Sequence, residues 1–142
     1  MPIKQLSLFV ENRPGSLTTV CRVLKENRLD IKTLSLADTQ QFGILRLLIK
    51  EYDVAKAKLE AAGFVVKLTD VLALTVPDRP GGLAEILESL DKHNLSVEYL
   101  YAFTFGREGK AIIVFRFENP ELALSELKSE PIEFVRSEEL FG

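Results

Sequence analysis

Apolar residues along the chain follow two different periods. In segments 6–10 and 72–76 they alternate with other residues, and this period of two predicts β-strands. Downstream of each segment they recur at positions i, i+3, i+4 and i+7, which predicts a helix with one buried stripe. Pro14 and Pro80 suit the first turn of these helices, because a proline there loses no hydrogen bond. The pattern therefore predicts a strand followed by a helix, twice.

The turn between strand and helix is repeated as well. Asn-Arg-Pro-Gly-Ser-Leu at 12–17 returns as Asp-Arg-Pro-Gly-Gly-Leu at 78–83, a shift of 66 residues, and the apolar positions of the neighbouring segments keep this shift. Repetition over such a length indicates two copies of one structural unit.

Further segments complete each copy. Second strands are predicted at about 30–38 and 95–105, third strands at 44–50 and 111–117, second helices at 54–63 and 122–131, and short fourth strands at 64–68 and 132–135. The order βαββαβ, with two helices on one face of a four-stranded antiparallel sheet, is the ferredoxin-like arrangement of the α+β class. We expect one unit at residues 1–69, a second at 70–136 and an acidic C-terminal tail at 137–142, with no linker between the units.

Composition limits the class of protein. The 142 residues are 46% apolar and carry a formal net charge of −3, so the chain offers no broad attraction for nucleic acid or anionic membranes. No apolar run approaches the roughly 20 residues that span a bilayer, and the N-terminus lacks the apolar stretch of a secretory signal. These features predict a cytoplasmic protein. The one cysteine, Cys21, aligns with Leu87 of the second copy and is expected in the core.

The alternating strand, the Asn/Asp-Arg-Pro-Gly-x-Leu turn, the amphipathic helix and the Asn-led entry into the next strand together resemble the ACT domain, and the resemblance covers nearly the whole chain, twice. It implies a non-catalytic regulatory module that binds a small ligand, usually an amino acid, at the junction of two such domains. In many members the second strands pair edge to edge, and the pocket lies beside the turns. We therefore expect the strand containing Leu34 beside the strand containing Leu100, in one eight-stranded antiparallel sheet with helices on one face.

The chemistry of the turns suits a ligand that carries a carboxylate. Glycines there let the backbone approach a ligand closely, and each helix start presents unpaired N–H groups at the positive end of its dipole. The resemblance adds that the side chain of Asn12 or Asp78 receives the ammonium group of the ligand. The candidate ligand-binding residues are Asn12, Arg13, Pro14, Gly15, Ser16, Leu17, Asp78, Arg79, Pro80, Gly81, Gly82, Leu83, Leu34, Leu100, Tyr99 and Tyr101. The turn residues also make a good entry into a helix without any ligand, and an arginine beside a turn is ordinarily a solvated charge, so both interpretations stay open.

The two second strands differ in side-chain size. The second copy has aromatic residues at a spacing of two, namely Tyr99, Tyr101, Phe103 and Phe105. The first copy has Thr33, Ser35, Ala37 and Thr39. The aromatic residues either pack against the other half or a second chain, or form a wall of a pocket. Because the copies differ, we expect one tight ligand site per chain, where the 12–16 turn meets the aromatic strand.

Catalytic chemistry finds little support in the sequence. His93 is the one histidine, no cysteine or histidine cluster suggests a metal site, and there is no nucleophile-elbow, phosphate-loop or dinucleotide motif. An RNA-recognition motif shares the βαββαβ order, but Ile112 and Val114 stand where its stacking aromatics belong, and the net charge is negative. We expect no enzyme activity, no cofactor, and no nucleic-acid or membrane partner.

These observations predict a stand-alone regulatory protein that binds an amino acid between its two ACT-like domains and controls a metabolic enzyme in trans, as a homodimer. The alternative is a regulatory or assembly subunit of an amino-acid metabolic enzyme that acts through protein contacts without a ligand of its own. Binding of free amino acids by the isolated protein separates the two, because a ligand that binds only the folded state stabilises it.

Overall fold

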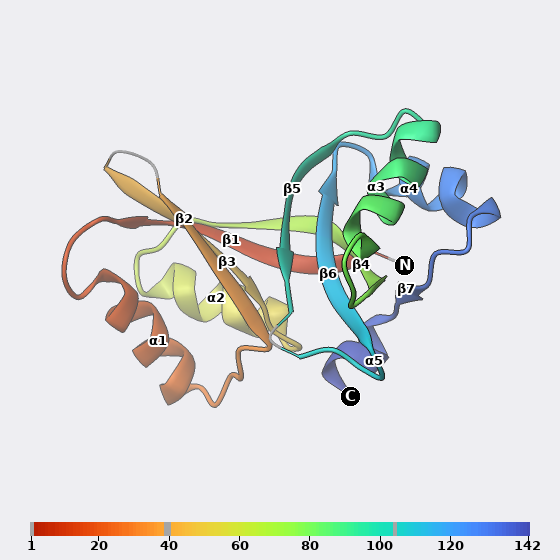
Figure 1. Cartoon of the computed structure of the whole chain (residues 1–142). Coiled ribbons are helices and arrows are strands. Elements are labelled where there is room, and N and C mark those ends of the chain that lie inside the picture. The colour runs from red at the N-terminus through yellow and green to blue at the C-terminus, as the bar shows by residue number, and fades with distance from the viewer. Residues whose placement is uncertain (1, 39–40, 104) are drawn as a thin grey trace. The chain divides into compact units, whose positions relative to one another are not determined.

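The order of helices and strands confirms the repeated βαββαβ pattern (Figure 1). The computed structural model describes residues 2–38, 41–103 and 105–142. In chain order its elements are β1 (Ile3–Glu11), α1 (Ser16–Glu26), β2 (Thr33–Asp38), β3 (Phe42–Leu48), α2 (Tyr52–Ala61), β4 (Val66–Pro77), α3 (Gly82–Lys92), β5 (Val97–Ala102), β6 (Lys110–Phe117), α4 (Pro120–Glu126), a 3-10 turn (Leu127–Ser129), β7 (Phe134–Val135) and α5 (Ser137–Phe141). Contacts between residues divide the chain into two compact units. Residues 4–69 make up most of the first unit, and residues 70–140 most of the second.

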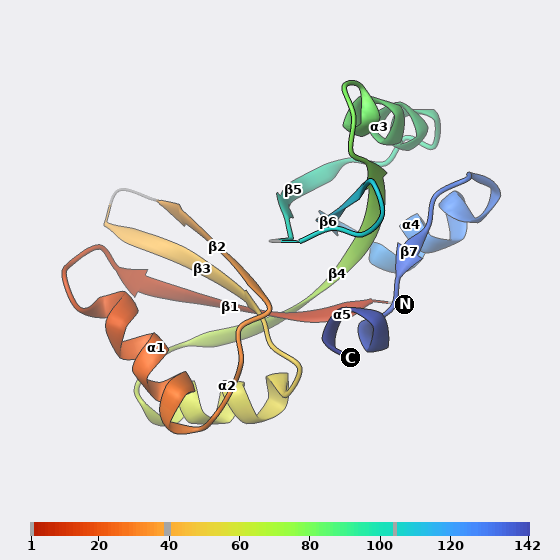
Figure 2. The same cartoon turned by 60° about the horizontal axis from the view of Figure 1, so that its bottom comes forward.

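In the first unit, strands with one apolar face pack against two helices. β3 lies between β1 and β2 and pairs antiparallel with both. Figure 2 shows α1 and α2 on the same face of these strands. The core between the two layers contains Leu8, Leu45, Val20 and Leu59, all of them buried. The alternation seen in the sequence thus corresponds to one face of β1 turned toward the helices.

The second unit is built in the same way, and its core of mainly aliphatic residues includes two phenylalanines. β6 lies between β4 and β5, and β7 pairs with β4, with Val135 opposite Ala73. Phe115 and Phe117 of β6 are buried and stack with their ring centroids 5.9 Å apart. Leu90 of α3 belongs to the same core.

The two predicted strands on either side of Thr69 and Asp70 are one continuous strand, β4. No glycine or proline interrupts the sequence from Val66 to Val76, so no turn residue ends the strand between the two copies. Within the described residues the sheet therefore has seven strands, and the expected number of eight is corrected.

The predicted pairing of the strand containing Leu34 with the strand containing Leu100 is wrong. Within the described residues β2 pairs with β3 and β5 pairs with β6, so that β2 and β5 stand at opposite ends of the order β2-β3-β1-β4-β6-β5. The reason is the continuous strand β4. It extends the sheet through the fourth strand of one copy and the first strand of the other, which leaves both second strands at the ends of the hydrogen-bonded order.

Some element boundaries also differ from expectation. α1 and α3 begin two residues after the prolines, because Gly15 and Gly81 have positive φ angles and precede the first helical residue. Cys21, expected in the core, is exposed, since the buried stripe of α1 runs through the neighbouring Val20.

The aromatic series of the second copy extends beyond its strand. β5 ends at Ala102, although the Phe103 amide still donates to the Ile112 carbonyl at 2.8 Å. Phe103 and Phe105 contact each other edge-on after the strand, with ring centroids 5.4 Å apart. Thr39, in the matching series of the first copy, lies outside the described residues.

Candidate functional site

The first repeated turn carries the chain from β1 into α1. Its start is fixed by two backbone hydrogen bonds: the Asn12 amide donates to the Gln41 carbonyl at 3.0 Å, and the Arg13 amide donates to the Glu11 carbonyl at 2.9 Å. Gly15 then takes a φ of +93°, a left-handed conformation that residues with a Cβ rarely adopt. The glycine is therefore required by the turn whether or not a ligand binds.

The N-terminus of α1 has no side-chain cap. Its N-cap residue, Gly15, has no side chain that could accept a hydrogen bond, and the first turn of the helix contains no acidic residue. The first amides of a helix lack partners within the helix and lie at the positive end of its dipole. A ligand carboxylate beside this turn would meet favourable charge and free donors.

The second turn repeats the same geometry. The Asp78 amide donates to the Gly109 carbonyl at 2.9 Å, and Gly81 has a φ of +84°. As in the first turn, a glycine at the N-cap leaves the helix start without a side-chain cap. The two turns thus share their backbone design, as the sequence repeat predicts.

The two turns differ in the residue that follows the left-handed glycine. Gly82 is buried, and a Cβ added to it would lie 1.9 Å from the carbonyl oxygen of Pro77, a distance that no real contact allows. The first copy has Ser16 at this position, so its turn leaves room for a side chain. The second turn is therefore the tighter of the two.

The two repeated arginines have different partners. Arg13 pairs with Glu11, at the end of β1, with 3.0 Å between Nε and Oε2. Arg79 instead pairs with Glu85, in the first turn of α3, with 2.7 Å between Nη2 and Oε2. Acidic charge thus already stands at the start of α3 but not at the start of α1. Of the two helix N-termini, that of α1 offers the better place for an anion.

A small hollow adjoins the first turn. It has a volume of about 90 Å³, and the residues that line it include Asn12, Arg13 and Leu17 of the predicted site. Leu36 of β2 lines it too, and sequence reasoning missed this residue. Leu36 follows the predicted Leu34 at a spacing of two, and both are exposed, so strand alternation could have identified it.

The other predicted turn residues differ in their exposure. Pro14 and Pro80 lie exposed in the turns. Leu17 is exposed, whereas its counterpart Leu83 packs against the core of the second unit.

The predicted residues of β5 lie on opposite faces of the strand. Leu100 is paired with the core residue Phe115 and so shares the face that the helices cover. Tyr99 and Tyr101 are half-buried on the other face, where Tyr99 is opposite Arg116. The three residues therefore do not form one wall. The expected contact between the 12–16 turn and the aromatic strand stays a prediction.

The groups with shifted pKa values, His93, Glu130 and Glu139, are not residues of either turn. Hydrogen bonds to Glu130 (3.0 Å) and, to a smaller extent, Glu126 (3.2 Å) raise the pKa of His93. The hydrogen bond between His93 and Glu130 also lowers the pKa of Glu130. These bonds join the end of α3 to α4 and the segment after it.

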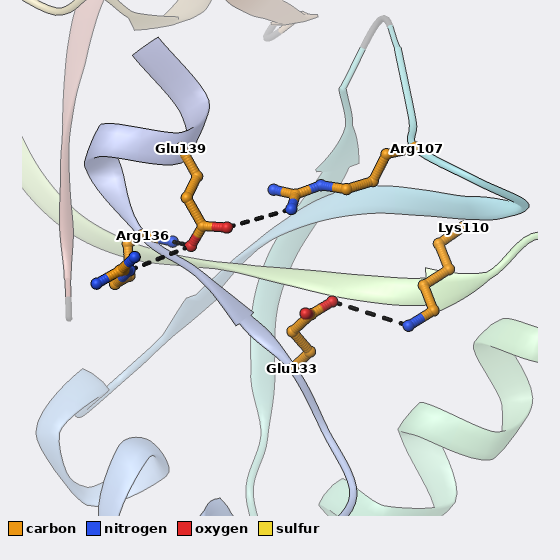
Figure 3. Close-up of polar contacts among 5 residues, drawn as sticks. All are labelled: Arg107, Lys110, Glu133, Arg136 and Glu139. Carbon is orange, nitrogen blue, oxygen red and sulfur yellow. Dashed lines mark hydrogen bonds and ion pairs between the residues drawn. The ribbon is translucent and has the colours of Figure 1, made fainter. Parts of the chain in front are cut away.

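Near the C-terminus, the pKa of Glu139 is lowered by the Arg136 backbone amide, which donates to its carboxylate, and then by the Arg107 and Arg136 side chains (Figure 3). Both pKa patterns are typical of structural ion pairs.

Metal binding and membrane insertion both need features that can be checked in the structure. No group of three or more histidine, cysteine, aspartate or glutamate side chains in the described part of the chain is arranged to hold a metal ion. Among the same residues, no helix has the length and apolar character needed to cross a lipid bilayer.

Known proteins share this architecture. The family model described as the ACT domain pair matches residues 1–142. The crystal structure of a protein from Bacteroides thetaiotaomicron has a TM-score of 0.91 at 33% identity, and the match covers 99% of this chain and 96% of that one. Regulatory subunits of aspartate kinase from Thermus thermophilus and Thermus flavus share the fold, with TM-scores of 0.65 and 0.61 at 17% and 16% identity, each match covering 87% of this chain and 89% of the other. A search of the curated proteins finds no match.

The repeated turn, the two βαββαβ-like units and the match along the full sequence agree: the chain belongs to the ACT domain pair family.

Proposed function

We propose that this chain is a regulatory protein that binds an amino acid beside its repeated turns and controls a metabolic enzyme in trans. The observation that carries the proposal is the start of α1, where Gly15 at a φ of +93° leaves the helix without a side-chain cap. An α-carboxylate suits this place because helix N-termini favour anions. We assign the ammonium group of the ligand to the side-chain oxygen of Asn12, which lines the adjoining hollow.

The hollow needs a second wall before it can hold a ligand. Its volume of about 90 Å³ is well below the roughly 300 Å³ at which ligand pockets begin. Leu34 and Leu36, each 49% exposed, lie on β2, which stands at one end of the strand order. An ACT unit of a second copy, laid against β2, would cover these leucines and deepen the hollow. We therefore propose a homodimer with the ligand at a junction of ACT units.

The proposed partner is a metabolic enzyme on a separate chain. Two of the structures with this fold are described as regulatory subunits of aspartate kinase, which supports an enzyme of amino-acid metabolism as the partner class. The regulatory character of ACT domains supports a protein without catalytic activity of its own. We propose a cytoplasmic location, where such an enzyme acts.

A second candidate function is that of an assembly subunit without a ligand. The observation that favours it is the exposure of Leu34 and Leu36, since exposed leucines on an end strand also suit a protein contact. This candidate predicts that the chain forms a complex with its enzyme whether or not free amino acids are present.

A thermal-shift screen of the protein against the common amino acids distinguishes the two functions. A ligand at 100 times its dissociation constant stabilises the folded protein by about 2.7 kcal/mol, which is readily measured. Titration calorimetry with the best ligand should then give about one tight site per chain, and light scattering should give the mass of a dimer. If no amino acid shifts the midpoint, the assembly function replaces the regulatory one.

Substitutions in the turns locate the site. Asn12→Ala should weaken binding more than the matched Asp78→Ala, and both positions are exposed, so folding is little affected. Gly15→Val should weaken binding further, since a β-branched residue is strained at a positive φ and crowds the approach of a ligand. Gly81→Val is its control in the second turn. Unchanged affinity in all four variants would leave the turns with a structural role only.

A further inference from the structure

Each unit has a groove bounded by the end of its first strand, the start of its first helix and the loop before its fourth strand. The groove of the first unit has a volume of about 550 Å³, and that of the second unit about 190 Å³. Most of the residues that line the second groove correspond along the repeat to residues that line the first. Phe9, Phe42 and Val65 of the first groove correspond to Thr75, Lys110 and Glu133 of the second.

The groove of the second unit is narrowed by polar contacts across it. The Thr75 amide donates to the Glu133 carbonyl at 3.0 Å, which draws the loop before β7 against β4. The side chain of Glu133 pairs with Lys110, with 3.9 Å between Oε1 and Nζ (Figure 3). Space for a ligand is thereby reduced to about a third of that in the first unit.

The groove of the first unit exposes apolar side chains instead. Phe9 is 59% exposed, Phe42 43% and Val65 75%. Large apolar side chains gathered in a concave site of several hundred Å³ are typical of small-molecule pockets. Burying these side chains against a ligand would be favourable, at about 25 cal/mol per Å² of apolar surface removed from water.

The rim of this groove carries two opposite charges. Arg13 and Glu11 both line it and form an exposed ion pair, with Nε and Oε2 3.0 Å apart. Exposed pairs of this kind contribute little to stability, so both side chains can turn to a ligand at small cost. Together they match the carboxylate and the ammonium group of a zwitterion. In the second unit Pro77 replaces the glutamate.

We infer that the groove of the first unit binds an amino acid with a large apolar side chain. Arg13 takes the carboxylate, Glu11 takes the ammonium group, and the apolar side chain lies against Phe9 and Val65. The inference rests on the proposed function for the class of ligand, an amino acid, but it places that ligand in the groove and not in the hollow beside β2. The groove adjoins the hollow beside β2, because Arg13, Glu11 and Phe42 line both. Ser16 and Thr19 line the groove and not the hollow, whereas Asn12 lines the hollow and not the groove.

The test measures binding of L-phenylalanine and L-leucine by titration calorimetry, with glycine as a zwitterion that lacks the side chain. Phe9→Thr and Val65→Glu install the residues of the second unit at exposed positions, so the fold should be unaffected. The matched control is Val54→Glu, which makes the same change at an exposed valine of α2 that does not line the groove. Nuclear Overhauser contacts from the phenylalanine ring to the Val65 methyl groups report the location directly.

We expect both apolar amino acids to bind more tightly than glycine, each groove variant to weaken their binding by about tenfold or more, and the control to bind like the unaltered protein. Contacts between the ligand ring and Val65 are expected as well. If amino acids bind with unchanged affinity to both groove variants but lose affinity in Asn12→Ala, the inference is overturned and the proposed function stands. If no amino acid binds the unaltered protein, both are overturned.

Discussion

Gly82→Ala should destabilise the second unit more than any other single glycine substitution in the two turns. The added Cβ would lie 1.9 Å from the carbonyl oxygen of Pro77 and 2.9 Å from its carbonyl carbon. That oxygen cannot move freely, because it accepts the hydrogen bond of the Arg79 amide at 3.0 Å. The backbone of the turn must therefore shift to admit the methyl group.

The magnitude follows from these contacts. Relieving such an overlap typically costs about 1–3 kcal/mol. A shift that also breaks the hydrogen bond between Arg79 and Pro77 adds about 1 kcal/mol, for a total of about 2–4 kcal/mol. The matched variant Gly81→Ala meets no atom within 4 Å, so its cost is the left-handed conformation alone, about 1–2 kcal/mol.

Urea unfolding followed by circular dichroism measures both variants. With a slope of about 2 kcal/mol per molar urea, Gly82→Ala should lower the midpoint by about 1–2 M and Gly81→Ala by about 0.5–1 M. Hydrogen exchange should place the lost protection in β6 and not in β3, because the overlap lies in the second unit. Equal midpoints for the two variants would show that the Pro77 carbonyl yields easily, which would refute the steric argument.

Three further predictions concern the second unit. Glu130 and Glu126 raise the pKa of His93 above 6.5, so the stability that this histidine gives the folded protein is fully present below pH 6.5 and is lost as the pH rises through the raised pKa. The urea midpoint should therefore fall over that pH range, and it should fall less in His93→Gln. Glu139→Gln should increase hydrogen exchange in α5 with little change in the global midpoint, since the groups that hold its carboxylate are exposed; unchanged exchange would mean that α5 is held by packing alone. Phe115→Ala, in the fully buried core, should lower the free energy of unfolding by about 3–5 kcal/mol, whereas Phe105→Ala, at a half-exposed position, should cost much less; similar costs would contradict the assigned core.

The sequence by itself determined the local elements and their repetition. The alternation at Leu6, Leu8 and Val10 predicts a strand with one buried face, and all three residues are buried. The glycine of each repeated turn has the positive φ angle that only glycine adopts readily. These features were accessible because they depend on residues within a few positions of one another.

The tertiary structure decided which segments meet. The pairing of β2 with β3 and not with β5 depends on β4 continuing through Thr69 and Asp70, and periodicity alone does not reveal where a strand finds its neighbours. Likewise, Phe9 and Val65 line one groove although 56 positions separate them in the chain, and the ion pair of Glu133 with Lys110 narrows the corresponding groove of the second unit. The repeat makes the two grooves equivalent in position, but their size follows from contacts between distant residues, which only folding brings together.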